Sequence, residues 1–527
     1  MKKTMKSTIL LAAALLGMLF TNCQRSGDTP LYQAIPSDVA LLYSLRVDQI
    51  LDKSGVINNF LPMAESMLEG NEEGQFLIDI LKDVNTMGID LSDIVFFIAN
   101  DGGGPNGAVV ARLTDRLKFT DFLGHLAETG MVINVEKKEG FYQAGVDDNL
   151  LIFNDHLLIA TQSIYGETLE QAAARVRALF TQAKEKSILG NDKFTQAFNT
   201  TDALLAYVNL APFSRDPGFK QMLTLTGMDI SSVSGIMGIS FPDGAMRMTT
   251  RVLSIDSALL QTQGRPLTLS LLDYIPAAPA IATAILNMDG QATYDNMQKS
   301  LTNFLTLAAM NGGFPAPTGG MLQAFGLLQS INGEVMLNIA SGTPYPAATL
   351  YAEVKDNRPL DALNEWLSEG PFQTFLTTTK LADNIYRAEV APLRLSVYYG
   401  IKDGRFFISN DEALKAHPGD KLDNSFKNTP VAKRVPAGAS GYFLLDISNL
   451  IQPIAFFANM RGGGGISPAL MADIDQFQYL EAYSIEDGKE VVLQLELKDK
   501  TKNVLKLTSD MAFKALETFT SSTYQSY

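Results

Sequence analysis

The chain contains a single cysteine, and its position suggests a specific chemistry. Cys23 follows three lysines within the first six residues and an apolar run, residues 9–20, that carries no charge. A basic start followed by such a run is typical of a secretory signal segment, and the run is shorter than the ~20 apolar residues that a transmembrane helix needs. We therefore predict that residues 1–22 are a signal peptide.

The sequence around Cys23 resembles a bacterial lipobox, in which the cysteine thiol is acylated and the chain is cut just before it. The usual pattern has leucine three residues before the cysteine and a small residue immediately before it, whereas Phe20 and Asn22 stand there. These two departures affect the expected cleavage efficiency. In the alternative, a general secretory signal is cut nearby and Cys23 remains a free thiol. An exposed unpaired thiol is a liability in an oxidising compartment, so its presence at this position alone favours lipid attachment at Cys23.

Motifs that could bind a cofactor or metal have structural interpretations. The segment from Gly102 to Gly107 fits G-x-G-x-x-G, but a strand-like sequence follows it, not the helix that a pyrophosphate site requires. A hairpin is therefore favoured, and no cofactor is predicted. The three histidines, His125, His156 and His417, have no second histidine or cysteine at ligand spacing, so no metal site is predicted.

The remaining notable side chains are acids and one tryptophan. Asp147, Asp148 and Asp155 flank a short strand without the pattern of a calcium loop, so turns are favoured over a calcium or acid–base site. Trp366 lies on the apolar side of a predicted helix, and a core position is favoured over a sugar-stacking platform. No catalytic residue is predicted from these patterns.

Composition restricts the class of partner. The net charge of −15 falls to about −18 without the three lysines of the signal peptide, and the acids are spread along the chain. Nucleic acid and anionic lipid headgroups are poor partners for such a surface. A chain of this length exceeds what one hydrophobic core usually serves, so several domains or subdomains are expected.

The sequence repeats itself. Four stretches each contain an apolar run of strand length followed by a predicted helix start, and three of them begin with an Ile-Pro or Val-Pro pair. Each is followed by a helix-like segment and then two β-rich segments joined by a turn, in two cases through Asp-Gly pairs that suit tight hairpins. The four stretches begin at Ile35, Thr200, Ile275 and Val435.

These repeats predict two homologous halves, residues 35–262 and 263–527, after a lipid-anchored tether at residues 23–34. We expect an α+β fold in which each half contains β-α-β-β-like units, with largely antiparallel sheets covered by helices. Asp48 and Ser448 are predicted helix N-caps, and the longest helix is expected at residues 167–186.

Several of these features resemble an uncharacterised family of Bacteroidetes lipoproteins that carries a domain of unknown function. They are the lipobox, the Ile-Pro pair before an apolar strand, the Asp-Lys-Ser-Gly segment at residues 52–55, and the G-x-D segments ahead of two hairpins. The resemblance implies an envelope lipoprotein with an internally duplicated body. It transfers no catalytic residue.

Two functions are therefore compared. The first is a non-enzymatic outer-membrane lipoprotein that binds an envelope protein or glycan, with the membrane contacted through its lipid anchor. The second is a carboxylate-dependent envelope hydrolase with its site between the two halves, because carboxylate catalysis depends on spacing in three dimensions and leaves little trace in sequence. The anchor suits either the periplasmic or the surface face of the outer membrane.

Overall fold

The computed structural model divides the chain into two compact units, which are described separately. Unit 1 comprises residues 1–220, 230–254 and 499–527, and unit 2 comprises residues 221–229 and 255–498. The C-terminal residues thus belong to unit 1, whereas the division by repeats placed them in the second half. The structure describes residues 29–68, 72–100, 105–128, 135–146, 149–162, 167–198, 202–215, 233–254, 265–295, 297–298, 326–342, 345–369, 375–450, 468–485 and 488–524.

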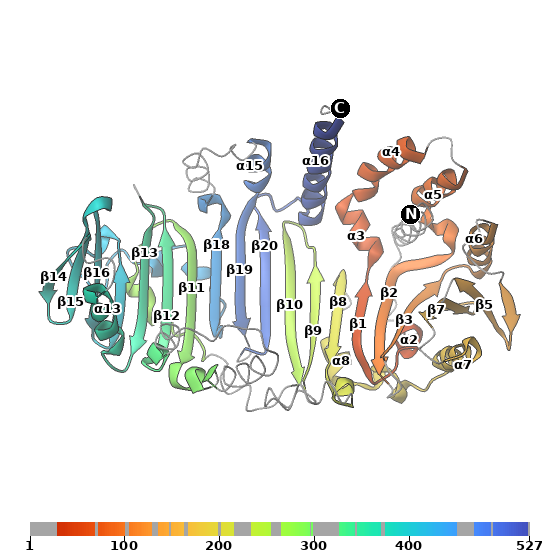
Figure 1. Ribbon diagram of the computed structural model, residues 1–527, viewed down its shortest axis with the longest axis horizontal. Coiled ribbons are helices and arrows are strands. Elements are labelled where there is room, and N and C mark those ends of the chain that lie inside the picture. The colour runs from red at the N-terminus through yellow and green to blue at the C-terminus, as the bar shows by residue number, and fades with distance from the viewer. Residues whose placement is uncertain are drawn as a thin grey trace. The chain divides into compact units, whose positions relative to one another are not determined.

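Unit 1 combines helices with short 3₁₀ segments and antiparallel strands (Figure 1). Its helical elements are α2 (Thr29–Gln33), α3 (Val47–Ser54), α4 (Val56–Leu68), α5 (Glu72–Lys82), η1 (Val84–Met87), α6 (Arg116–Glu128), α7 (Leu169–Phe180), η2 (Lys184–Lys186), η3 (Ile188–Gly190), α8 (Asp192–Ala197), η4 (Ala211–Arg215) and α16 (Val504–Tyr524). Its strands are β1 (Val39–Leu45), β2 (Ile89–Asn100), β3 (Pro105–Leu113), β4 (Glu136–Lys138), β5 (Phe141–Val146), β6 (Asn149–Phe153), β7 (Leu157–Gln162), β8 (Leu204–Asn209), β9 (Ser234–Ser240) and β10 (Ala245–Ser254).

The strands of unit 1 form one antiparallel sheet, in the order β10-β9-β8-β1-β2-β3-β7-β6-β5-β4. The first described strand, β1, thus lies inside the sheet. Leu42 of β1 is opposite Phe97 of β2 on one side and Tyr207 of β8 on the other. The backbone groups of β1, which alternate in direction along the strand, are therefore paired with β2 on one side and β8 on the other.

Both faces of the unit 1 sheet are covered, because alternate side chains of a strand point to opposite faces. Val95 and Phe97 of β2 lie in a core that includes side chains of α2, α7 and α8. Ile94 lies in a second core, with side chains of α3, α5 and α6. Thus helices pack on both sides of the sheet.

Unit 2 is built from the same kinds of element. Its helical elements are η6 (Ser270–Tyr274), α13 (Arg358–Glu369), η7 (Ala391–Leu393), η8 (Glu412–Leu414), η9 (Phe426–Asn428), η10 (Ala432–Arg434) and α15 (Pro468–Ile474). Its strands are β11 (Ala280–Asp289), β12 (Ile331–Ala340), β13 (Ala347–Val354), β14 (Leu376–Ala382), β15 (Ile385–Val390), β16 (Leu395–Lys402), β17 (Arg405–Ser409), β18 (Gly441–Asp446), β19 (Phe477–Ile485) and β20 (Glu490–Leu497).

The unit 2 sheet has the strand order β20-β19-β18-β11-β12-β13-β17-β16-β15-β14, again antiparallel throughout. Numbered along the chain within each unit, this order is the same as in unit 1. The core on one face includes Met336, Tyr351 and Phe407 together with η6 and η9. On the other face, α13 packs over β15, β16 and β17 through Leu360 and Tyr399.

Equivalent hydrogen bonds hold the segment before the first strand of each unit. In unit 1, Ile188 N–H donates to the Ile35 carbonyl at 2.9 Å, beside a bridge between Pro36 and Ser187. In unit 2, Phe426 N–H donates to the Ile275 carbonyl at 2.7 Å, beside a bridge between Pro276 and Ser425. The Ile-Pro pairs seen in the sequence therefore mark a structural contact that recurs.

The structure confirms the mixed α+β class with antiparallel pairing, and it corrects several local predictions. Asp48 lies inside the first turn of α3, with Arg46 at the N-cap position. Ser448 is helical, and Asp446 accepts the hydrogen bond from Asn449 N–H instead. Leu31 of α2, which lies in the range 23–34 predicted to be the tether, is buried.

Two further predictions concern a helix and the tryptophan. The helix expected at residues 167–186 is α7, which begins after a capping box at Thr168 and ends at Phe180; among the described helices, α16 is longer. Trp366 is 54% exposed on α13, so its predicted core position is wrong. Leu360 and Leu363 of the same helix make the core contacts instead.

Two adjacent phenylalanines test the two-faced burial of β2. Phe97 is 2% exposed and Phe96 is 36% exposed. We expect Phe97→Ala to lower the free energy of unfolding by about 3–5 kcal/mol, because it leaves a cavity in a packed core. Phe96→Ala is the matched control and should cost about 1 kcal/mol. Denaturant unfolding followed by circular dichroism measures both, and equal losses would contradict the assignment of faces.

Candidate functional site

The buried acids of the sheets are the side chains with the most unusual environment. Glu334 of β12 is fully buried, at 0% exposure, and lies one residue before Val335, which is opposite Leu286 of β11. A charged carboxylate in such a position must be compensated by hydrogen bonds or by an opposite charge.

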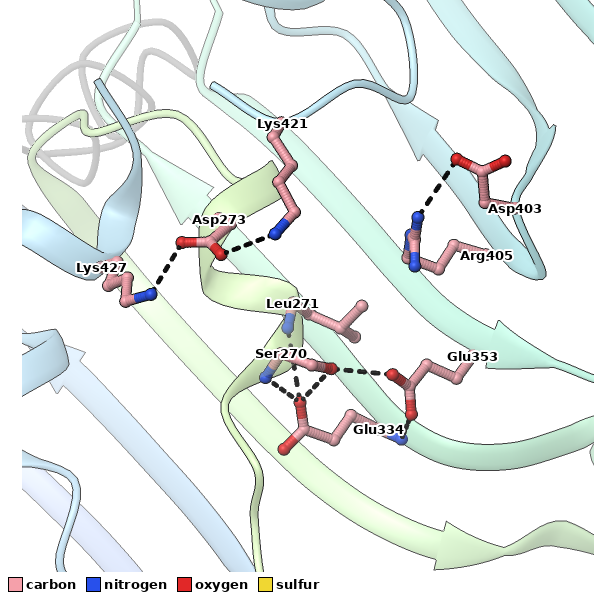
Figure 2. A network of polar contacts seen from close by, with 9 residues as sticks. All are labelled: Ser270, Leu271, Asp273, Glu334, Glu353, Asp403, Arg405, Lys421 and Lys427. Carbon is pink, nitrogen blue, oxygen red and sulfur yellow. Dashed lines mark hydrogen bonds and ion pairs between the residues drawn. The ribbon is translucent and has the colours of Figure 1, made fainter. Parts of the chain in front are cut away.

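Backbone N–H groups of the segment around η6 supply that compensation (Figure 2). One carboxylate oxygen of Glu334 accepts from the N–H groups of Thr268 and Leu269 at 2.5 and 2.6 Å. The other accepts from Ser270 N–H at 2.7 Å and from Leu271 N–H at 3.4 Å. Successive N–H groups converging on one point form an anion-binding nest, and here the chain's own carboxylate fills it.

The same contact stabilises a strained backbone position. Leu269 has a φ of 58°, in the left-handed region that a residue with a branched side chain seldom adopts. Such a conformation costs about 1–2 kcal/mol. Its N–H group donates to Glu334, so the carboxylate holds the turn that leads into η6.

A second acid joins the network through the hydroxyl of Ser270. Ser270 Oγ lies 2.9 Å from a carboxylate oxygen of Glu334 and 2.7 Å from one of Glu353 on β13. The other oxygen of Glu353 accepts from the N–H group of Glu334 at 2.9 Å. A Cβ atom at Gly333, whose φ is 142°, would lie 2.0 Å from that carboxylate, so glycine is needed there.

Basic side chains lie beside this network in the same unit. Asp273 of η6 pairs with Lys421 at 3.3 Å and with Lys427 at 3.2 Å. Burial alone would raise the pKa of Asp273, but the two lysines outweigh it and lower the pKa below its ordinary value. The ionised carboxylate therefore stabilises the fold at neutral pH, and this contribution is lost as the pH falls below that ordinary value. Arg405 lies 4.3 Å above the ring of Tyr274.

Unit 1 has a buried acid at the corresponding place in its sheet. Asp93 is 5% exposed. It precedes Ile94, which pairs with Leu45 near the end of β1. Glu334 has the equivalent position, because the next residue, Val335, pairs with Leu286 near the end of β11. The carboxylate of Asp93 accepts from the Tyr32 hydroxyl at 2.9 Å and from the Ser44 hydroxyl at 2.5 Å. Tyr32 belongs to α2, so this acid also holds the helical segment before the first strand.

A further acidic cluster lies on β19 and β20. Arg434 donates to Glu481 at 2.9 Å and to Glu496 at 2.6 Å, and the Tyr442 hydroxyl donates to Glu481 at 2.7 Å. Burial, followed by the adjacent Glu481 carboxylate, raises the pKa of Tyr442. The guanidinium of Arg434 thus donates hydrogen bonds to two carboxylates that are less than 10% exposed. The geometry is that of a charge-compensated structural contact.

The histidines, the glycine-rich segment and Asp155 have structural positions in unit 1 and unit 2. The three histidines are exposed: His125 lies on α6, His156 in the turn between β6 and β7, and His417 in a bend after η8. Within the described part of the chain, no group of three or more His, Cys, Asp or Glu side chains is placed to hold a metal ion. Residues 105–107 of the glycine-rich segment belong to β3, which pairs with β2, so the hairpin interpretation is confirmed for them. Asp155 forms an exposed ion pair with Arg116 at 2.7 Å.

Three sites fall outside the described residues: Cys23, the pair Asp147 and Asp148, and Gly102 to Gly104. Among the described helices, none is long and apolar enough to cross a membrane. Sequence reasoning missed Glu334 and its neighbours. A signal was present, because Glu334 is the one charged residue in the strand sequence INGEVMLNIA, and an acid also opens the apolar run DIVFFIA of β2.

Comparison with known proteins identifies a family. The family model described as Domain of unknown function (DUF4836) matches residues 32–505. Two solved structures, crystal forms IV and III of TP0453, are each 9% identical to this chain. They cover 43% of it, with 81% and 80% of their own chains aligned and TM-scores of 0.24 and 0.25. A TM-score this low does not establish a shared fold. Among curated proteins none matches the chain.

The carboxylate of Glu334 provides a test of this network. Glu334→Gln should lower the free energy of unfolding by about 2–4 kcal/mol, because it removes the charge and turns an amide donor toward other donors. Glu353 is half-buried and accepts one hydrogen bond from the Ser270 hydroxyl and one from the Glu334 N–H group, so Glu353→Gln is the matched control and should cost about 1 kcal/mol. Denaturant unfolding followed through Trp366, which lies in unit 2, measures both. An unchanged midpoint for Glu334→Gln would contradict the proposed role of the nest.

Proposed function

The chain belongs to the family described as Domain of unknown function (DUF4836), and on that premise we propose that it is an outer-membrane lipoprotein that binds a protein or glycan of the cell envelope without catalysing a reaction. Its anchor would be the acylated Cys23. The observation that carries the non-enzymatic assignment is that the most buried acids described in each unit are engaged by the fold.

The anchor is supported by the sequence at the N-terminus. A basic start, a short apolar run and a lone cysteine occur in the order that lipoprotein signal peptides have. Each acyl chain contributes about 0.8 kcal/mol per buried CH₂, so several chains together hold a protein stably on a bilayer. The lipid therefore replaces a spanning segment as the membrane contact.

The environment of the acids supports a binding role over carboxylate catalysis. A catalytic acid or base must exchange protons with substrate or water. Glu334 is fully buried, and its two oxygens receive hydrogen bonds from four successive backbone N–H groups. Glu481 is 5% exposed and bonded to Arg434 and Tyr442. These carboxylates are occupied by donors of their own unit, which suits a structural role.

We also propose that the body arose by duplication of one α+β half. Three observations in the separate units support this: the shared strand order, the Ile-Pro segments bridged to Ser187 and Ser425, and buried acids at equivalent register positions, Asp93 and Glu334. The backbone hydrogen bonds to the carbonyls of Ile35 and Ile275 recur, whereas the donors to Asp93 and Glu334 differ. The duplicated bodies would offer two related surfaces to envelope partners.

Membrane attachment is tested by substitutions on either side of the cleavage point. We expect Cys23→Ala to move the chain from the outer-membrane fraction to the soluble fraction, because no thiol remains to be acylated. Asn22→Gly restores the small residue of the usual pattern and should speed maturation without changing the location. Membrane fractionation with metabolic labelling by a fatty acid measures both effects. Labelling that persists in Cys23→Ala would contradict the assignment.

Protease treatment of intact and lysed cells then identifies the exposed face. Digestion on intact cells that depends on Cys23 would mean surface display. Protection until lysis would mean a periplasmic face.

The binding function is tested with the purified Cys23→Ala chain. We expect it to retain a defined glycan on an array, or a defined protein from an outer-membrane extract, and to lose this ligand when the chain is heat-unfolded as a control. Hydrolysis of an envelope glycan or peptide by the purified chain, abolished in Glu353→Gln, would contradict a non-enzymatic role. If the chain retains neither a glycan on the array nor a protein from the extract, that result also contradicts the binding function.

A further inference from the structure

The outermost strand of the unit 2 sheet has an open hydrogen-bonding edge. β14 pairs with β15, and among the described residues no other strand pairs with it (Figure 1). Leu376 is half-buried, and the other six residues of the strand are exposed. An edge of this kind is a template for another strand unless charge, proline, a bulge or shortness protects it. The register of β14 shifts only at its far end, between Lys380 and Ala382, and residues 376–380 pair regularly with β15.

The corresponding edge of unit 1 is protected in that way. Its outermost strand, β4, has only three residues, all charged: Glu136, Lys137 and Lys138. In β14 three consecutive threonines occupy the centre, and its one charged residue, Lys380, forms an ion pair with Asp383 at 3.0 Å. The two edge strands thus have the same place in their sheets, but β4 is short and fully charged whereas β14 is longer and mostly uncharged.

The register of β14 shows which backbone groups point away from β15. Ala391 N–H donates to the Phe375 carbonyl at 3.2 Å, so the backbone groups of Phe375 face β15. Backbone groups alternate along a strand, and those of Thr377 and Thr379 therefore also face β15. The N–H and carbonyl groups of Leu376, Thr378 and Lys380 point outward from the sheet.

We propose that β14 pairs antiparallel with β14 of a second copy of this chain, about a two-fold axis at Thr378. In this register Thr378 exchanges both hydrogen bonds with Thr378 of the second copy, and Leu376 pairs with Lys380 of the second copy. An axis at Lys380 would instead place two ammonium groups opposite each other, which is unfavourable. An axis at Leu376 would leave most of the free edge unpaired.

The side chains fit the same register. Thr377 lies opposite Thr379 of the second copy, and threonine pairs across strands are favourable. Phe375 immediately precedes β14 and is 53% exposed, so one copy of this side chain lies at each end of the contact. The threonine pairs and the two Phe375 side chains repeat about the axis, as an isologous interface requires.

A proline substitution tests the free edge. The whole mature chain carrying Cys23→Ala, which removes association through acyl chains, should show the mass of two copies in sedimentation and light scattering. Thr378→Pro should show the mass of one copy, because it removes an outward N–H group that an edge strand can lose without harm to its own sheet. A single-copy mass for the parent chain, or a two-copy mass for Thr378→Pro, would overturn the proposal.

A matched pair of double variants tests the register. In Thr377→Lys/Thr379→Lys, lysines face each other twice across the interface, and the dissociation constant of the dimer should rise at least about tenfold. In Thr377→Glu/Thr379→Lys, the same positions carry opposite charges and the dimer should persist. Loss of the dimer in both variants, or in neither, would overturn the Thr378-centred pairing. Unchanged circular dichroism and Trp366 emission establish that each variant is folded.

Discussion

Each unit depends on the placement of its first strand between partners from opposite ends of its sequence. β1 is hydrogen-bonded to β2 and to β8, and β11 is hydrogen-bonded to β12 and to β18. This arrangement removes both edges of the first strand and joins two groups of strands into one sheet. The remaining elements then follow from burial, because a sheet with apolar side chains on both faces needs cover on both sides.

The buried acids are best understood as part of that placement. Glu334 and Asp93 each stand beside the end of the central strand and bind the helical segment that precedes it. One does so through backbone N–H groups and the other through hydroxyls, so the position of the negative charge recurs while its donors differ. A carboxylate used in this way determines where the chain enters the sheet.

The sequence predicted the elements that local patterns encode. The α+β class, the β2–β3 hairpin and the turn at Asp243 and Gly244 follow from strand alternation and glycine chemistry, and Gly244 has the required positive φ of 75°. What the sequence did not predict depends on contacts between distant residues. Glu334 meets Thr268, 66 positions away, and Trp366 is exposed because neighbouring leucines of α13 fill the contact. Cys23 remains a prediction, since it lies outside the described residues.

The position of the first strand has a consequence for the order of folding. Leu45 of β1 pairs with Leu204 of β8, about 160 positions along the chain, whereas its other partner, Ile94 of β2, is about 50 positions away. The shorter loop closes at a lower entropic cost, so β1 and β2 pair first and one side of β1 stays open until β8 arrives. The future interior strand is therefore an edge for part of the folding process, and a chaperone that shields strand edges would act on the chain at this stage.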